Sequence, residues 1–143
     1  MSRSSQVVAA VVAVAFGGVQ YVGAGQAGKL VAPVHGEAKV EITKPNSKVV
    51  GKDVVTTILV KNVEKAPIAG FKVEEYWYDR AGNPLGGGVY RHPRPLQPGE
   101  IITVTLKTPK SSNLDRNQCG FVHAYGPVKK TVVPKLVVPK PGT

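Results

Sequence analysis

The stretch EEYWYDRAGNPLGGG, residues 74–88, decides how the chain is interpreted, because it joins three aromatic residues to a turn rich in Gly and Pro. Residues 68–79 have the alternation and the aromatic content typical of a β-strand. DRAGNP then supplies the Asp, Gly, Asn and Pro that close a hairpin. LGGGVYRH, residues 85–92, predicts a weak return strand at a sheet edge. The stretch is therefore interpreted as a hairpin of an all-β protein.

Strict alternation within this strand places Phe71, Val73 and Trp77 on one face, which we expect to be the core face. Glu75 falls on the same face. A carboxylate is not expected inside a core, so either a bulge shifts the register or Glu75 lies near an open end.

The rest of the chain predicts further strands joined by short turns. Gly and Pro together number 28 (16 and 12), and the dominant apolar residue is Val. Six or seven strands in about 100 residues, without a helix-length connection, predict an antiparallel immunoglobulin-like Greek-key β-sandwich of about seven strands. Besides the hairpin, the clearest strands are expected at residues 37–44, 53–62, 101–108 and 119–125.

The N-terminus has the pattern of a secretory signal. Arg3 precedes thirteen uninterrupted apolar or Gly residues, 7–19. A helix of that length spans about 20 Å, less than the roughly 30 Å of a bilayer core. We therefore expect a signal helix over residues 1–24 that is cleaved after Ala24 or Ala27, and an exported protein, periplasmic or secreted. The alternative is an uncleaved anchor that tethers the protein to a membrane.

The mature chain divides into three parts. Residues 25–36 are expected to form a flexible leader without a site, residues 37–128 the sandwich, and residues 129–143 a basic tail of Val, Pro and Lys. The formal net charge is +10, which becomes +9 when Arg3 is removed with the signal. This excess predicts an anionic polymer, a membrane surface or an envelope protein as partner, and no specific nucleic acid.

The order of several motifs resembles a known kind of exported domain. The VKN strand end, YWYDRAGNPL, the LQPGE corner and FVHAYG, in that order over about residues 38–128, resemble bacterial FxLYD-type and related immunoglobulin-like envelope domains. Trp77, Tyr78 and Asp79 match the end of the FxLYD signature, and Glu75 stands where its Phe would be. The resemblance implies a binding or structural module without catalysis.

A basic aromatic surface is the candidate binding site. Tyr76 and Tyr78 point away from Trp77 under alternation, and basic residues lie near them in the sequence. Such a surface suits a glycan, an anionic polymer or a partner protein. The alternative is that both tyrosines pack under a neighbouring strand. The complete candidate surface is Lys72, Tyr76, Tyr78, Tyr90, Arg91 and Arg94.

The only other candidate chemistry is a copper or redox site. Cys119 and His123 lie on one face of a predicted strand, and His92 lies upstream, which are the residue types of a blue-copper centre. The single Met, Met1, lies in the signal, so the usual axial ligand is missing. We expect instead that Cys119 is a buried thiol and that the protein has no cofactor.

No enzyme active site is predicted. Glu74 and Glu75 are adjacent in a strand, so their carboxylates point to opposite faces and cannot act on one substrate. The GGG run at residues 86–88 is followed by neither Lys-Ser/Thr nor a helix, so it is not a phosphate-binding loop.

Overall fold

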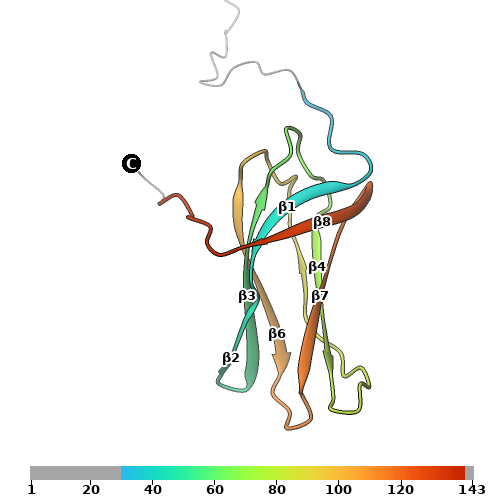
Figure 1. The fold of residues 1–143 in the computed structure, drawn as a ribbon, viewed down its shortest axis with the longest axis vertical. Coiled ribbons are helices and arrows are strands. Elements are labelled where there is room, and N and C mark those ends of the chain that lie inside the picture. Colours follow the sequence, from blue (N-terminus) through green and yellow to red (C-terminus); the bar gives the residue numbers. More distant parts are fainter. Residues whose placement is uncertain (1–29, 141–143) are drawn as a thin grey trace, which may run out of the picture.

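The computed structural model describes residues 30–140, and it is an all-β structure in this range (Figure 1). None of these residues forms a helix that is long and apolar enough to cross a membrane. The signal helix expected over residues 1–24 lies outside the described range. The strands are β1 (Ala38–Thr43), β2 (Asn46–Val50), β3 (Asp53–Asn62), β4 (Lys72–Tyr78), β5 (Val89–Arg91), β6 (Ile101–Pro109), β7 (Arg116–His123) and β8 (Gly126–Val133).

The eight strands form one mixed, curled sheet. Its strand order is β2-β3-β1-β8-β7-β4-β5, and β6 pairs with β3. The consecutive strands β1 and β2 both pair with β3, β2 along its first half and β1 near its end. β1 then pairs in parallel with β8, which joins the β2–β3–β6 half to the β7–β4–β5 half, as the crossing ribbons in Figure 1 show.

The core lies inside the curl, between the two halves. Alternating residues of β3 and β6 are buried, and so are alternating residues of β4, as the period of two requires. Phe71 and Phe121 pack with ring centroids 6.3 Å apart. The Thr108 hydroxyl of β6 donates a hydrogen bond to Glu75 of β4, which links the two halves directly. Trp77 is 8% exposed, which confirms that it is a core residue.

The glycine run after β4 has a packing role. The backbone N–H of Glu75 donates to the Gly88 carbonyl at 2.8 Å. A Cβ at Gly87 would lie 1.7 Å from the Glu75 carbonyl oxygen, and a Cβ at Gly88 would lie 2.9 Å from the Lys107 carbonyl oxygen. Only residues without a side chain let this segment lie against both β4 and β6.

The hairpin and the central strands agree with the sequence-based expectation. β3 covers residues 53–62 as predicted, and β5 is an edge strand in the sheet order. β4 begins at Lys72, later than expected, because the chain turns at residues 69–70, where Gly70 has a φ of 61°. Ile68, before this turn, forms only an isolated bridge with Leu96. β7 ends at His123, so Tyr125 lies in the following turn and is exposed.

Three other expectations are corrected. The sheet is not purely antiparallel, because β1 and β8 run in parallel. The predicted tail boundary at residue 128 falls inside β8, which continues to Val133 through its pairing with β1. Part of the predicted leader is fixed, since the Val34 N–H donates to the Pro67 carbonyl and the Gly36 N–H to the Tyr125 carbonyl.

Candidate binding surface on the outer face of β4 and β7

The outer face of β4 carries a chain of polar contacts that fixes Tyr76. Lys72 Nζ lies 2.6 Å from Glu74 Oε1, and the Tyr76 hydroxyl donates to Glu74 Oε2, also at 2.6 Å. These hydrogen bonds, from Lys72 first and from Tyr76 second, hold the pKa of Glu74 below its usual value. The same carboxylate raises the pKa of Tyr76. Glu74 is therefore an anion that orients both neighbours.

The Tyr76 ring is held in place and is still open to solvent. Gly120 of β7 pairs with Glu74, diagonally beside Tyr76. A Cβ at Gly120 would lie 3.8 Å from Tyr76 Cε2, so the ring lies beside a position that has no side chain. Tyr76 is 42% exposed. The alternative in which Tyr76 packs under a neighbouring strand is therefore wrong.

Tyr78 and Arg91 complete this face. Tyr78 pairs with Arg116 of β7, whose guanidinium carbon lies 5.9 Å from the tyrosine ring centroid, a cation–π distance. Arg91 of β5 pairs with Lys72. Directly paired residues of an antiparallel sheet share a face. Four of the six predicted residues thus lie on one face, and we call Lys72, Tyr76, Tyr78 and Arg91 the tyrosine surface.

Tyr90 and Arg94 do not belong to this surface, which corrects the predicted set. Tyr90 pairs with Val73, a core residue, so its ring lies on the opposite face of the sheet and packs partly against the core. Arg94 lies beyond the end of β5, where its Nη1 contacts both carboxylate oxygens of Glu100 at 2.7 Å. Both residues belong to a separate polar network.

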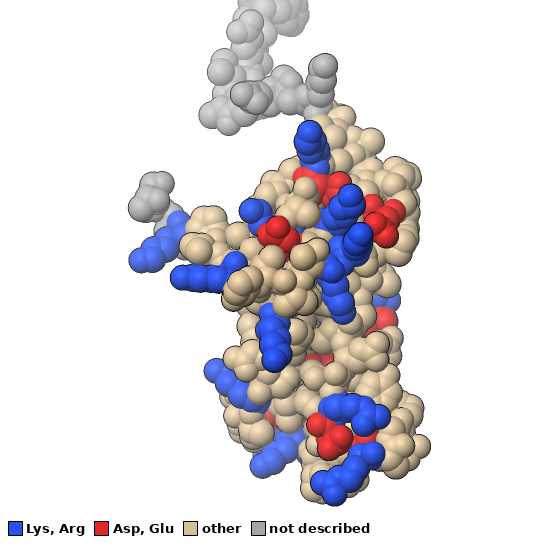
Figure 2. Space-filling view, viewed as in Figure 1, with Lys and Arg blue, Asp and Glu red and all other residues tan. Residues whose placement is uncertain are grey.

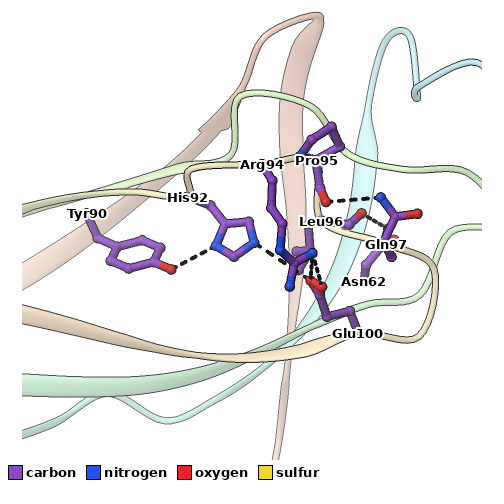
Figure 3. A network of polar contacts seen from close by, with 8 residues as sticks. All are labelled: Asn62, Tyr90, His92, Arg94, Pro95, Leu96, Gln97 and Glu100. Carbon is purple, nitrogen blue, oxygen red and sulfur yellow. Dashed lines mark hydrogen bonds and ion pairs between the residues drawn. The ribbon is translucent and has the colours of Figure 1, made fainter.

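This network closes the corner between β5 and β6 (Figure 3). The Tyr90 hydroxyl lies 2.8 Å from His92 Nδ1, and His92 Nε2 faces Glu100 Oε1 at 3.7 Å. Among the described residues, His92 Nε2 has no hydrogen-bond partner, and Glu100 Oε1 has only its ion-pair contact with Arg94. Burial lowers the pKa of His92 despite the nearby Glu100 carboxylate. The neighbouring Asn62 amide donates to the Leu96 carbonyl at 2.8 Å, so the network fixes the corner.

The residues of the alternative copper site are not assembled. Cys119 is a free, buried thiol whose pKa burial raises to about 11. His123 shares its strand, but its Nε2 lies 2.7 Å from the Gly36 carbonyl oxygen. His92 follows β5, which pairs with the opposite edge of β4 from β7. Residues 30–140 contain no group of three or more His, Cys, Asp or Glu placed to hold a metal ion.

Glu75 occupies neither a bulge nor an open end. The pairing of β4 with β7 is continuous from Lys72 to Tyr78, and Glu75 is 2% exposed. Its carboxylate accepts hydrogen bonds from Trp77 Nε1 at 2.8 Å, Asn117 Nδ2 at 2.9 Å and Thr108 Oγ1 at 3.2 Å. Three donors satisfy the hydrogen-bonding capacity of this buried carboxyl group. The residue is a structural element of the core.

One surface feature was missed from the sequence. The β2–β3 hairpin, whose tip VVGKD covers residues 49–53, was interpreted only as a strand preceded by a turn. A two-residue turn that begins with Gly, preceded by Val49 and Val50 and followed after Asp53 by Val54 and Val55, is a hairpin signal that would have located it.

Comparison of the chain with protein-family models, with curated proteins and with solved structures finds no match.

Proposed function

We propose that this protein is an exported, noncatalytic interaction module with an immunoglobulin-like sandwich fold. The strand order supports the fold: β2, β3 and β6 form one half, β5, β4, β7 and β8 the other, with antiparallel pairing inside each half. That grouping suits two facing sheets of Greek-key type. The expected signal over residues 1–24 supports export to the periplasm or the medium.

The exposure of Tyr76 carries the proposal that the tyrosine surface binds a partner. A tyrosine supplies a large amphipathic contact area and loses little conformational entropy on binding when its ring is already fixed. Here Glu74 holds the hydroxyl and Gly120 leaves room beside the ring. Arg91 adds positive charge to the same face, where the charge of Lys72 is paired with that of Glu74. This surface suits an extended envelope polymer or a segment of an envelope protein.

A capture experiment with two matched tyrosine variants tests this function. Tyr76→Ala removes the fixed ring, whereas Tyr125→Ala removes a tyrosine of similar exposure, 47%, from the turn after β7. The wild type and both variants are immobilised, and each is offered a neutral glycan, an acidic polysaccharide and a native envelope extract. We expect Tyr76→Ala alone to lose most of the retention. Equal retention by wild type and Tyr76→Ala would contradict the proposal.

Export is tested separately by intact mass. Expression in a secretion-competent host is expected to yield a chain that lacks its first 24 or 27 residues, because the apolar run is short and is followed by small residues. Recovery of the full-length chain in the membrane fraction would favour the tethered alternative.

A further inference from the structure

The β2–β3 hairpin ends in an exposed apolar tip. Val50 pairs with Asp53, so the loop consists of Gly51 and Lys52 alone, and Gly51 has a φ of 61° as the first residue of a type II′ turn requires. Val49 is 56% exposed and Val50 is 51% exposed. Because consecutive strand residues point to opposite faces, both faces of the tip present a valine.

Lysines surround this apolar tip. Lys48 of β2 and Lys107 of β6 both pair with Val55 of β3, so they share the outer face, two strands or about 10 Å apart. Lys52 and Lys110 meet at the end of the hairpin, where the Lys110 N–H donates to the Lys52 carbonyl at 2.9 Å.

Positive charge at the tip is nearly uncompensated. Within the described residues 46–55 and 105–110, Asp53 is the single carboxylate against four lysines. No ion pair involves any of these lysines in the described part of the chain, where Lys72 is the only lysine that makes one. Lysine and arginine side chains are spread along the whole face seen in Figure 2, including the end at which Figure 1 shows the β2–β3 hairpin.

We propose that this end of the molecule docks on an anionic lipid surface. The valines would enter the boundary between headgroups and acyl chains, and the lysines would contact the lipid phosphates. The docking surface, called the basic tip below, consists of Lys48, Val49, Val50, Lys52, Lys107 and Lys110.

The exposed valines favour a membrane over a soluble polyanion. An acidic polysaccharide is recognised by charge alone and gains nothing from valines on both faces of a hairpin. An interface rewards both features, because apolar burial and attraction to anionic headgroups add. The basic tip belongs to the β2–β3–β6 half of the sheet and the tyrosine surface to the β4–β5–β7 half, so this inference does not depend on the proposed function.

Vesicle sedimentation tests the inference, and its two double lysine variants have the same net charge. Wild type is mixed with vesicles of 30% phosphatidylglycerol in phosphatidylcholine, and with pure phosphatidylcholine. The double variant Lys48→Gln/Lys107→Gln neutralises two lysines of the basic tip. The matched control Lys39→Gln/Lys129→Gln neutralises two exposed lysines that pair across β1 and β8, away from the tip. Val49→Thr/Val50→Thr removes the apolar contribution and keeps β-branched residues in the strand.

We expect binding to the anionic vesicles only, reduced about 25-fold by the tip lysine variant, since each lysine near an anionic surface contributes about fivefold. The control should lose much less, and the valine variant at least about threefold. If the two double lysine variants lost vesicle binding equally, net charge alone would explain the binding and the inference would be overturned. Full binding by the valine variant would also overturn it, and so would the absence of binding by wild type.

A fluorescent probe locates the contact directly. Cys119 is buried, so a Val50→Cys variant labels selectively at the tip, and a Thr103→Cys variant labels an exposed position on β6 as a control. An environment-sensitive probe at residue 50 is expected to shift to the blue on addition of anionic vesicles, while one at residue 103 does not. No shift at residue 50 in vesicle-bound protein would place the contact elsewhere and overturn the inference.

Discussion

Trp77→Ala is expected to lower the free energy of unfolding by about 3–5 kcal/mol, the range for removing a large buried aromatic side chain. Trp77 is 8% exposed, and its Nε1 is one of three donors to the buried Glu75 carboxylate. The substitution therefore leaves a cavity and also removes a donor from a group that is only 2% exposed. Because domains of this size are stable by about 5–15 kcal/mol, the variant will be marginal.

Trp77→Phe separates these two contributions. It retains most of the ring volume but removes the N–H, so its cost should be about 1–3 kcal/mol, the cost of leaving a buried acceptor short of a donor. Urea denaturation followed by far-UV circular dichroism is the suitable assay, since Trp77 is the only Trp and its fluorescence is lost in both variants. A loss below about 1 kcal/mol for Trp77→Ala with an unchanged m-value would refute the core assignment.

Three further predictions test other parts of the structure. Cys119 should react with thiol reagents at pH 8 roughly a hundredfold more slowly in the folded protein than in denaturant, because burial raises its pKa to about 11; equal rates would contradict its burial. Gly87→Ala should prevent folding or lower the melting temperature sharply, since its Cβ would overlap the Glu75 carbonyl oxygen. Gly86→Ala meets no neighbouring atom and should cost less, namely the backbone strain of an Ala at a φ of 87°. The lowered pKa of His92 means that, as pH falls below about 6.5, the unfolded chain binds its proton first and stability decreases. His92→Gln should remove that part of the loss, and parallel pH–stability curves for the two proteins would contradict it.

Alternation predicted the faces of the strands well. It assigned Trp77 to the core and Tyr76 to the opposite face, and it located β3 and β6 to within one residue. These features are local, because a half-buried strand needs only its own period of two. β2 has no such signal, since all five of its residues are exposed.

What the sequence did not reveal depends on pairing between distant segments. The β1–β8 pair joins residues about 90 positions apart, and nothing in the basic tail indicates that Lys129 will lie beside Lys39. Glu75 was correctly predicted to lie on the core face. Its donors Thr108 and Asn117, however, are 33 and 42 positions away in the sequence. Because those partners could not be identified from the sequence, the carboxylate on the core face was explained by a bulge or an open end, and neither exists.

The pairing of distant segments also explains why the predicted binding surface included residues from two faces of the sheet. Tyr90 was grouped with Tyr76 because both are tyrosines near one hairpin, yet their faces are set by the register between β4 and β5. That register is fixed by the close passage of Gly87 and Gly88 along β4 and β6. A glycine run indicates a close approach in general terms, but its partner strands are known only from the fold.

The charges of this protein divide into those that hold the structure and those that are free for a partner. Lys72 with Glu74 and Arg94 with Glu100 form ion pairs, and Lys130 donates to the Cys119 carbonyl at 3.2 Å. The lysines of the basic tip have no such role in the described residues, so their mutual repulsion opposes folding slightly. Salt therefore acts in opposite directions: it screens this repulsion and favours the fold, while it weakens attraction to an anionic surface over the same range of about 8 Å. Salt also screens the ion pairs that hold the structure, so a loss of lipid binding at raised salt is assigned to the contact when circular dichroism shows the same fold at both salt concentrations.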